Sequence, residues 1–219
     1  MTAGLKFGRR APVSGKARNM VVFLHGYGAN GDDLLGLADP LSGHMRDTVF
    51  IAPDAPDACS GTPFGRQWFG IPAFDGSSLA DAMAAMEKSA LQLNAFLDVR
   101  MADEGLSDAQ VMLLGFSQGA MMSLHVAPRR KTPFAGVIAI SGRLIRPDRL
   151  QAELVVKPPV LLIHGDQDPV VDFAKMGKAG DALVAAGLET FGHVMKGTGH
   201  GIAPDGLGIA LAFMKERLG

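Results

Sequence analysis

The chain has 219 residues, a net charge of −1 and 47% hydrophobic residues, values typical of a folded globular protein rather than a disordered one. Its 21 basic and 22 acidic residues form no long run of like charge, so nothing supplies the basic surface that nucleic-acid binding needs. A chain of this length still fits one hydrophobic core, and we expect a single domain over residues 1–219.

The cysteine content and the N-terminal region bear on the cell compartment. Cys59 is the only cysteine, which excludes an intramolecular disulfide and a cysteine metal cluster. The first residues, MTAGLKFGRR, lack the apolar stretch of a signal peptide, and no run of about 18 apolar residues exists to span a bilayer. We therefore expect a cytoplasmic protein without stable membrane insertion.

Short apolar runs alternate with longer segments of helical period, a pattern that predicts an α/β fold with a mostly parallel central sheet flanked by helices. The expected strands are 20–24, 49–52, 111–116, 137–140, 160–163 and, more weakly, 191–195. Helices are expected at 32–45, with Pro40 as a break or kink, and at 78–101, 173–186 and 205–217. Only residues 142–159 separate two late strands, which leaves no room for a large cap domain and predicts an open site.

The strongest functional signal is the segment GFSQGA at residues 115–120. It follows an apolar strand and precedes a helical stretch that stops at Pro128, which is the context of the nucleophile elbow G-x-S-x-G. The flanking glycines let strand and helix approach closely, and the helix N-terminus directs its free N–H groups at a developing oxyanion. We expect Ser117 to be the nucleophile. The alternative, a chance serine at a helix N-cap, does not account for the flanking elements.

A serine hydroxyl becomes a good nucleophile when a histidine takes its proton and an acid orients that histidine. In this fold the acid follows a late strand, and the segment HGDQDPVV after strand 160–163 contains two carboxylates. Asp168 is farther along the loop and better placed to reach another strand's loop, so we favour it as the acid. Asp166, nearer the strand, is the alternative, with an expected structural role in accepting hydrogen bonds from loop amides.

Six histidines compete for the role of general base. His200 alone lies in a glycine-rich loop after the last expected strand and before the last helix, where this fold places the base. The other five lie at strand ends, where they would brace loops, or inside predicted helices and a strand: His25, His164, His44, His125 and His193.

The tetrahedral intermediate of acyl transfer needs an oxyanion hole with two N–H donors. One is the backbone N–H of Gln118, directly after the nucleophile. The other should come from the loop after an early strand, FLHGYGANGDDL, and we expect the backbone N–H of Tyr27.

With these segments placed, the chain resembles the family of small α/β-hydrolases that includes carboxylesterases, acyl-protein thioesterases and phospholipases. The resemblance spans about residues 20–218 and rests on LHGYGANGDDL, APDAP, GRQWFGI, LLGFSQGAMMSLHVA, AISGRL, IHGDQDPVV and GTGHGI, in family order. It implies the α/β-hydrolase fold, the catalytic triad Ser117, Asp168 and His200, and the amides of Tyr27 and Gln118 as oxyanion donors.

The resemblance also implies that Trp68 and Phe69 lie beside the active site, where such members bind acyl or alcohol groups. The residues alone leave open whether Trp68, the only tryptophan, is instead a core residue. Tyr27 stands where similar proteins often carry leucine, and Gly201 follows the base where many have a polar or acidic residue. Both departures bear on the substrate and leave the reaction class unchanged.

We expect a serine carboxylesterase that hydrolyses esters of small to medium acyl length through an acyl-enzyme, without a metal or other cofactor. The alternatives are a lysophospholipase or acyl-protein thioesterase, favoured if a long apolar groove lies beside Ser117, and, more remotely, a non-catalytic binding protein, against which the intact triad argues. The expected partner is a small-molecule ester or lipid-like substrate, not nucleic acid, and a homodimer is left open. Cys59 is disfavoured as a nucleophile because no strand–turn–helix surrounds it.

Overall fold

The computed structural model describes residues 4–59 and 62–219. Its main sheet has seven strands in the order β1-β3-β2-β6-β7-β8-β9, of which only β1 is antiparallel to its neighbour. Strands β4 and β5 form a separate two-stranded sheet. The strands are β1 Phe7–Arg10, β2 Asn19–Leu24, β3 Thr48–Pro53, β4 Asp57–Ala58, β5 Arg66–Gln67, β6 Val111–Phe116, β7 Gly136–Ile140, β8 Val160–Gly165 and β9 Thr190–Met195.

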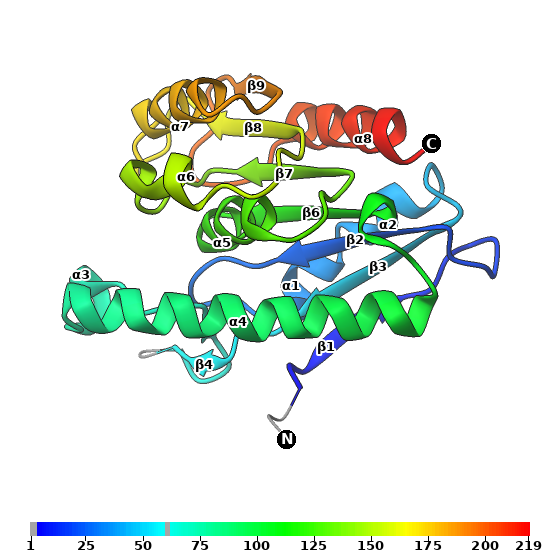
Figure 1. Ribbon diagram of the computed structural model, residues 1–219, viewed down its shortest axis with the longest axis horizontal. Coiled ribbons are helices and arrows are strands. Elements are labelled where there is room, and N and C mark those ends of the chain that lie inside the picture. Colours follow the sequence, from blue (N-terminus) through cyan, green and yellow to red (C-terminus); the bar gives the residue numbers. More distant parts are fainter. Residues whose placement is uncertain (1–3, 60–61) are drawn as a thin grey trace.

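Helices cover both faces of the sheet (Figure 1). They are α1 Gly31–Leu35, α2 Ala38–Ser42, α3 Pro72–Asp75, α4 Leu79–Glu104, α5 Gln118–Val126, α6 Pro147–Glu153, α7 Ala174–Ala185 and α8 Pro204–Leu218. Buried residues of α4, α5, α6 and α7 share one apolar cluster, and those of α1, α2 and α8 share the other. Alternate residues of each central strand enter the two clusters, as Val22 and Phe23 of β2 do, because successive side chains point to opposite faces. The sheet is thus buried on both sides.

The sequence-predicted strands are all present and mostly extend by one or two residues. Strand β1 was not predicted because FGRR is short and partly polar, and its place at the sheet edge depends on pairing with β3. Its basic residues find acidic partners on helices, since Arg9 pairs with Glu104 and Arg10 with Asp39. A strand of two residues, such as β4 or β5, is too short to show the residue pattern from which a strand is predicted.

The expected helix at 32–45 is two short helices, and the prediction of a break at Pro40 is wrong. The break falls at residues 36–37, between α1 and α2. Pro40 is the third residue of α2, where its missing N–H would have no intrahelical acceptor in any case. Helix α4 begins after Ser78, whose side chain accepts from the N–H of Asp81, and ends at Gly105 in the left-handed conformation.

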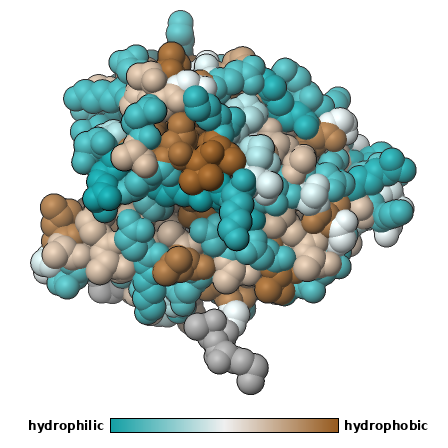
Figure 2. Space-filling model, in the orientation of Figure 1, coloured by the Kyte–Doolittle hydropathy of each residue, from teal (hydrophilic) through white to brown (hydrophobic). Residues whose placement is uncertain are grey.

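The fold class is confirmed: a mostly parallel sheet lies between helices, and only the seven-residue helix α6 separates β7 from β8, so there is no large cap in the described part of the chain. Figure 2 shows that the face seen in Figure 1 mixes hydrophilic and apolar residues, with several separate apolar areas. No helix within residues 4–59 and 62–219 has the length and apolar character to cross a membrane.

Candidate active site

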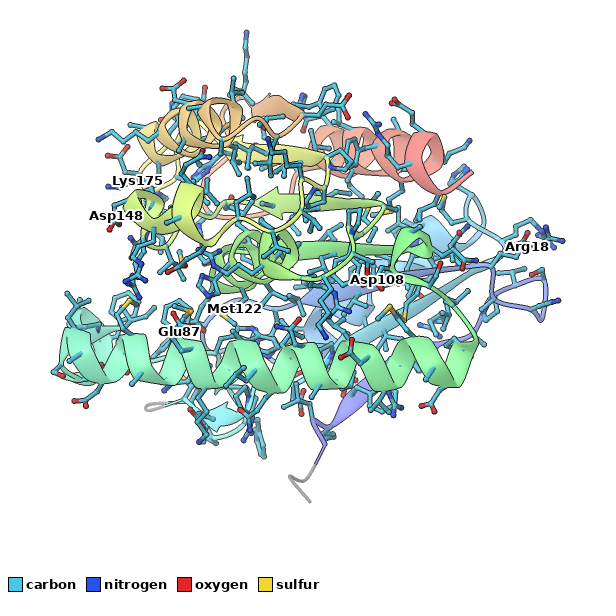
Figure 3. All side chains as sticks on the ribbon, in the orientation of Figure 1. Arg18, Glu87, Asp108, Met122, Asp148 and Lys175 are labelled. Carbon is cyan, nitrogen blue, oxygen red and sulfur yellow. The ribbon has the colours of Figure 1, made fainter. Side chains whose placement is uncertain are left out.

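The parallel strands all end at the same edge of the sheet, and the arrowheads of β2, β7 and β8 point toward it (left in Figure 1). Helices α3 and α6 lie at this end, and Figure 3 places Asp148 of α6 and Lys175 of α7 there as well. Loops at the carboxyl ends of parallel strands are where α/β folds build their ligand sites.

Ser117 lies between the end of β6 and the start of α5, in a backbone conformation that few non-glycine residues adopt (φ 54°, ψ −114°). Its N–H donates to the carbonyl of Ile140 (2.8 Å) and its carbonyl accepts from Met121 (3.1 Å), which hold the strained turn in place. A Cβ on Gly115 would collide with the carbonyl of Gly119, and a Cβ on Gly119 with the carbonyl of Leu24. These contacts explain why the turn has glycine on both sides of the serine.

The three predicted triad residues are in hydrogen-bond contact. The Nε2 atom of His200 lies 3.0 Å from Ser117 Oγ, and its Nδ1 atom lies 2.8 Å from Asp168 Oδ2. The serine follows β6, the aspartate follows β8 and the histidine follows β9, so three segments far apart in sequence meet at one edge of the sheet. This geometry lets His200 accept the serine proton at Nε2 while Asp168 holds the N–H at Nδ1.

The carboxylate of Asp168 is fully buried yet ionised. Burial opposes ionisation, but hydrogen bonds from His200 and from the N–H groups of Val171 and Val170 outweigh it and lower the pKa of Asp168. The amides of Val170 and Val171 both donate to Oδ1, at 2.8 and 2.9 Å, which leaves Oδ2 for the histidine.

Asp166 has the structural role expected of the alternative acid. Its Oδ1 atom accepts from the backbone N–H of Gly197 at 2.7 Å and so ties the loop after β8 to the loop that carries His200.

Among the remaining histidines, His25 braces a loop at the end of β2. Its Nδ1 atom lies 2.7 Å from the carbonyl of Gly26 and its Nε2 accepts from the N–H of Ala55 at 2.9 Å. Burial is the main reason that its pKa is lowered, and this keeps the ring neutral.

Two of the other histidines lie in the predicted elements and one does not. His193 is in β9, where its Nε2 lies 2.8 Å from Asp205. His125 is buried in α5, and burial lowers its pKa although Glu87 lies 3.6 Å away on the side of α4 that faces α5 (Figure 3). His44 was expected inside a helix but lies in a turn after α2, because that helix ends at Ser42.

His164, the other histidine expected to brace a loop, has a contact that was not predicted. Its Nε2 atom lies 2.8 Å from the carbonyl of Val171, within the loop after β8, and 3.2 Å from Oδ2 of Asp168. The motif HGDQD places the histidine four residues before the acid, but only the turn of the loop brings the two side chains together.

The segments predicted to supply the oxyanion hole lie beside Ser117. A Cβ on Gly26 would be 3.2 Å from the Cβ of Ser117, so the loop that includes Tyr27 passes directly along the nucleophile. Gln118 is the first residue of α5, where backbone N–H groups have no acceptor within the helix.

The Gln118 side chain ties Trp68 and Phe69 to the site through their backbones. Its Oε1 accepts from the N–H of Trp68 at 2.8 Å and its Nε2 donates to the carbonyl of Phe69 at 2.7 Å. The Trp68 side chain is fully buried and its indole N–H donates to the carbonyl of His25, while Phe69 is 5% exposed. This burial favours the core alternative for Trp68.

Two aromatic contacts at the site were not predicted. The Phe116 ring lies 4.9 Å from the imidazole of His200, and the Tyr27 ring lies 5.6 Å from that of Phe74. Phe74 is on α3 and is 63% exposed. Phe116 directly precedes the nucleophile, which was an available signal, whereas nothing in the sequence near Phe74 indicates its contact.

In residues 4–59 and 62–219, no group of three or more histidine, cysteine or acidic side chains is arranged to hold a metal ion. The arrangement of Ser117, His200 and Asp168 is that of nucleophilic acyl transfer, which side chains and backbone amides can carry out.

The family model described as phospholipase/carboxylesterase matches residues 11–218. The chain belongs to this family of α/β-hydrolases. The resemblance seen in the sequence motifs is therefore confirmed, and it places the chain among hydrolases that act on esters.

Relatives of this phospholipase/carboxylesterase family member cover nearly its whole length. The crystal structure of esterase PE8 is 42% identical, covers 99% of this chain and all of its own, and superposes with a TM-score of 0.93. Acyl-protein thioesterase 1 of Neurospora crassa is 30% identical over an alignment of 221 positions, which covers 94% of this chain and 90% of the relative. Esterase YpfH of Escherichia coli is 25% identical over 91% of this chain and 83% of its own.

Proposed function

We propose that the protein is a serine carboxylesterase that hydrolyses carboxylic esters through an acyl-enzyme on Ser117. The observation that carries this proposal is the continuous chain of hydrogen bonds from Ser117 Oγ to His200 and on to Asp168, at 3.0 and 2.8 Å, on a strained turn between strand and helix. The family and the likeness to esterase PE8 support the same reaction class.

In the first half of the proposed reaction, His200 Nε2 takes the proton of Ser117 as Oγ attacks the ester carbonyl carbon. Negative charge develops on the carbonyl oxygen, where the backbone N–H groups of Gln118 and Tyr27 and the N-terminal end of α5 stabilise it. His200 then gives its proton to the leaving alkoxide, and an alcohol departs. In the second half, His200 takes a proton from water, the resulting hydroxide attacks the acyl-enzyme, and Ser117 Oγ recovers the proton as the acid is released.

A thioesterase is the second candidate, because the Neurospora crassa relative is named acyl-protein thioesterase 1. The same acyl-enzyme serves a thioester, since only the leaving group changes from an alcohol to a thiol. A lysophospholipase is the third, on the family's description as phospholipase/carboxylesterase. We favour a small to medium acyl group with Trp68 and Phe69 close to it, because Gln118 ties both backbones to the segment of the nucleophile.

The experiment is a hydrolysis panel of p-nitrophenyl esters from acetate to palmitate, run beside palmitoyl-CoA and a lysophospholipid under the same conditions. We expect kcat/KM to be highest for an ester of short or medium chain. A maximum at p-nitrophenyl palmitate would contradict the acyl length that we propose. A kcat/KM for palmitoyl-CoA that exceeds every oxygen ester would replace the carboxylesterase with a thioesterase.

A further inference from the structure

The imidazole of His164 is in contact with the carboxylate of the proposed triad. His164 is in β8 and is 1% exposed. Its Nε2 atom lies 2.8 Å from the carbonyl oxygen of Val171 and 3.2 Å from Asp168 Oδ2. Both neighbours are hydrogen-bond acceptors. An unprotonated Nε2 would therefore place its lone pair against the lone pairs of two oxygens, which repel it. The ring therefore holds a proton on Nε2.

The hydrogen bond from His164 goes to Val171, and Val171 is also one of the residues that hold the acid. The N–H groups of Val170 and Val171 donate to Asp168 Oδ1 at 2.8 and 2.9 Å. Fixing the Val171 carbonyl thus fixes the turn that aims Oδ2 at His200. The same N–H edge of His164 lies next to Oδ2 and adds a favourable electrostatic contact.

The carboxylate depends on these donors because water does not reach it. The side chain of Asp168 is 0% exposed, so water cannot replace a hydrogen-bond donor that is lost. The buried anion is then left without that partner. We propose that His164 is a positioning residue, which holds Asp168 in the orientation in which Oδ2 accepts the Nδ1–H of His200. The inference rests on the proposed function of Ser117, His200 and Asp168.

The groups in contact with His164 determine which property of the enzyme changes when His164 is replaced. Asp168 contacts its Nε2, His200 contacts the same carboxylate oxygen, and the Phe173 ring packs edge-on at 6.0 Å. Without the His164 N–H, the turn that carries Asp168 is held less firmly and the contact between Oδ2 and the Nδ1–H of His200 weakens. The loss should therefore appear in kcat, while substrate binding changes little.

The experiment compares His164→Leu, which removes the donor, with His164→Gln, which keeps an N–H at a similar reach. His193→Leu is the matched control, because it removes a histidine whose hydrogen bond of 2.8 Å goes to Asp205 and not to the triad. Turnover is normalised to the serine that a fluorophosphonate labels, so misfolded protein does not count.

We expect His164→Leu to lower kcat per labelled serine by roughly 10- to 100-fold, with KM within about 3-fold of wild type. His164→Gln should recover most of kcat, and His193→Leu should match the wild type. A kcat within about 2-fold of wild type in His164→Leu would overturn the proposal. So would a His164→Gln variant as slow as His164→Leu, since an N–H at this position would then not be what holds the acid.

If His164→Leu does not fold, nitrogen-15 NMR of histidine-labelled wild-type protein decides instead. The proposal requires the proton of His164 on Nε2 throughout the pH range of activity, and a ring protonated only on Nδ1 would overturn it. Failure of the proposed function itself has a different signature: wild-type protein would neither hydrolyse the esters nor be labelled at Ser117.

Discussion

Ser117 keeps a backbone conformation that costs about 1–3 kcal/mol, and its neighbours hold it there. In this conformation Oγ makes no capping hydrogen bond to α5 and lies 3.0 Å from Nε2 of His200. At the other nitrogen of that imidazole, the buried carboxylate of Asp168, whose pKa is lowered, stays ionised and accepts a hydrogen bond from Nδ1–H. Each of the three side chains thus has its partner in place before a substrate arrives.

Replacing Ser117 by Ala removes Oγ but keeps Cβ, so the strained turn and the stability of the protein should change little. We expect kcat to fall by at least ~10³-fold and covalent labelling by a fluorophosphonate to disappear. Mass spectrometry of the labelled protein checks the second outcome. Full labelling of the variant at another serine would remove Ser117 from its proposed role.

Asp168→Asn should cost far more activity than Asp166→Asn. An asparagine at 168 offers an N–H as well as an oxygen to His200 and so permits the wrong tautomer, which costs up to about 10⁴-fold in kcat in such triads. An asparagine at 166 keeps an oxygen that accepts from Gly197, and we expect a loss of less than about 10-fold. Steady-state kinetics on both folded variants checks the ranking. The opposite order would make Asp166 the acid.

At the scale of elements, the end of β6 and the start of α5 carry the nucleophile, and the segment after β5 is tied to them. Gln118 makes this tie with one acceptor and one donor, to the backbones of Trp68 and Phe69. The Ser89 hydroxyl of α4 donates to the carbonyl of Trp68 from the other side. The buried tryptophan thus sets the spacing between α4, α5 and the loop of Tyr27.

Gln118→Ala should therefore lower the stability of the protein and leave its catalytic rate nearly unchanged. Two buried backbone groups would lose their partners, which we expect to lower the free energy of unfolding by about 2–4 kcal/mol. The backbone N–H at 118 is kept, so kcat of the folded protein should stay within ~10-fold of wild type. Denaturant unfolding measures the free energy of unfolding, and kinetics normalised to the labelled serine measures kcat. A drop in kcat of ~10²-fold in folded protein would mean that the side chain itself takes part in stabilising the oxyanion.

At the scale of the whole molecule, two buried histidines outside the proposed triad make stability depend on pH. Burial is the main cause of the lowered pKa of both His25 and His125. In the unfolded chain a histidine has a pKa near ~6.5, so below that pH the unfolded state binds protons that the folded state does not. Their contribution to stability is therefore present above about pH 6.5 and is lost as pH falls toward the lowered values.

We expect the free energy of unfolding to fall by up to about 1.4 kcal/mol per pH unit for each of these two histidines below pH ~6.5. Denaturant unfolding at several pH values from 7.5 to 5 measures the slope, and His125→Gln should make it shallower by about half. An unfolding free energy that stays flat over this range would contradict the neutral, buried state of both rings. The lowered pKa of Asp168 adds a separate loss of stability only below about pH 4.

Features that depend on local pattern could be predicted from the sequence. The strands β2, β3, β6, β7 and β8 are wholly or almost wholly buried, so each reads as a short apolar run whatever the rest of the chain does. The elbow around Ser117 is equally local, because the glycines that it needs lie within two residues. Chain order alone then pointed to the loops of Asp168 and His200, which the structure brings together, although their catalytic roles stay a proposal.

Other features followed only from tertiary contacts. The core position of Trp68 depends on Gln118, some 50 residues away, and the tryptophan itself is equally suited to a core or a binding site. The approach of His164 to Asp168 needs the turn after β8, and the edge strand β1 needs β3 as its partner. Sequence by itself determined which segments bury both faces and which turn carries the serine, because burial and steric fit act on near neighbours. Only the tertiary structure decided which polar groups meet, since that depends on contacts between segments that the sequence separates.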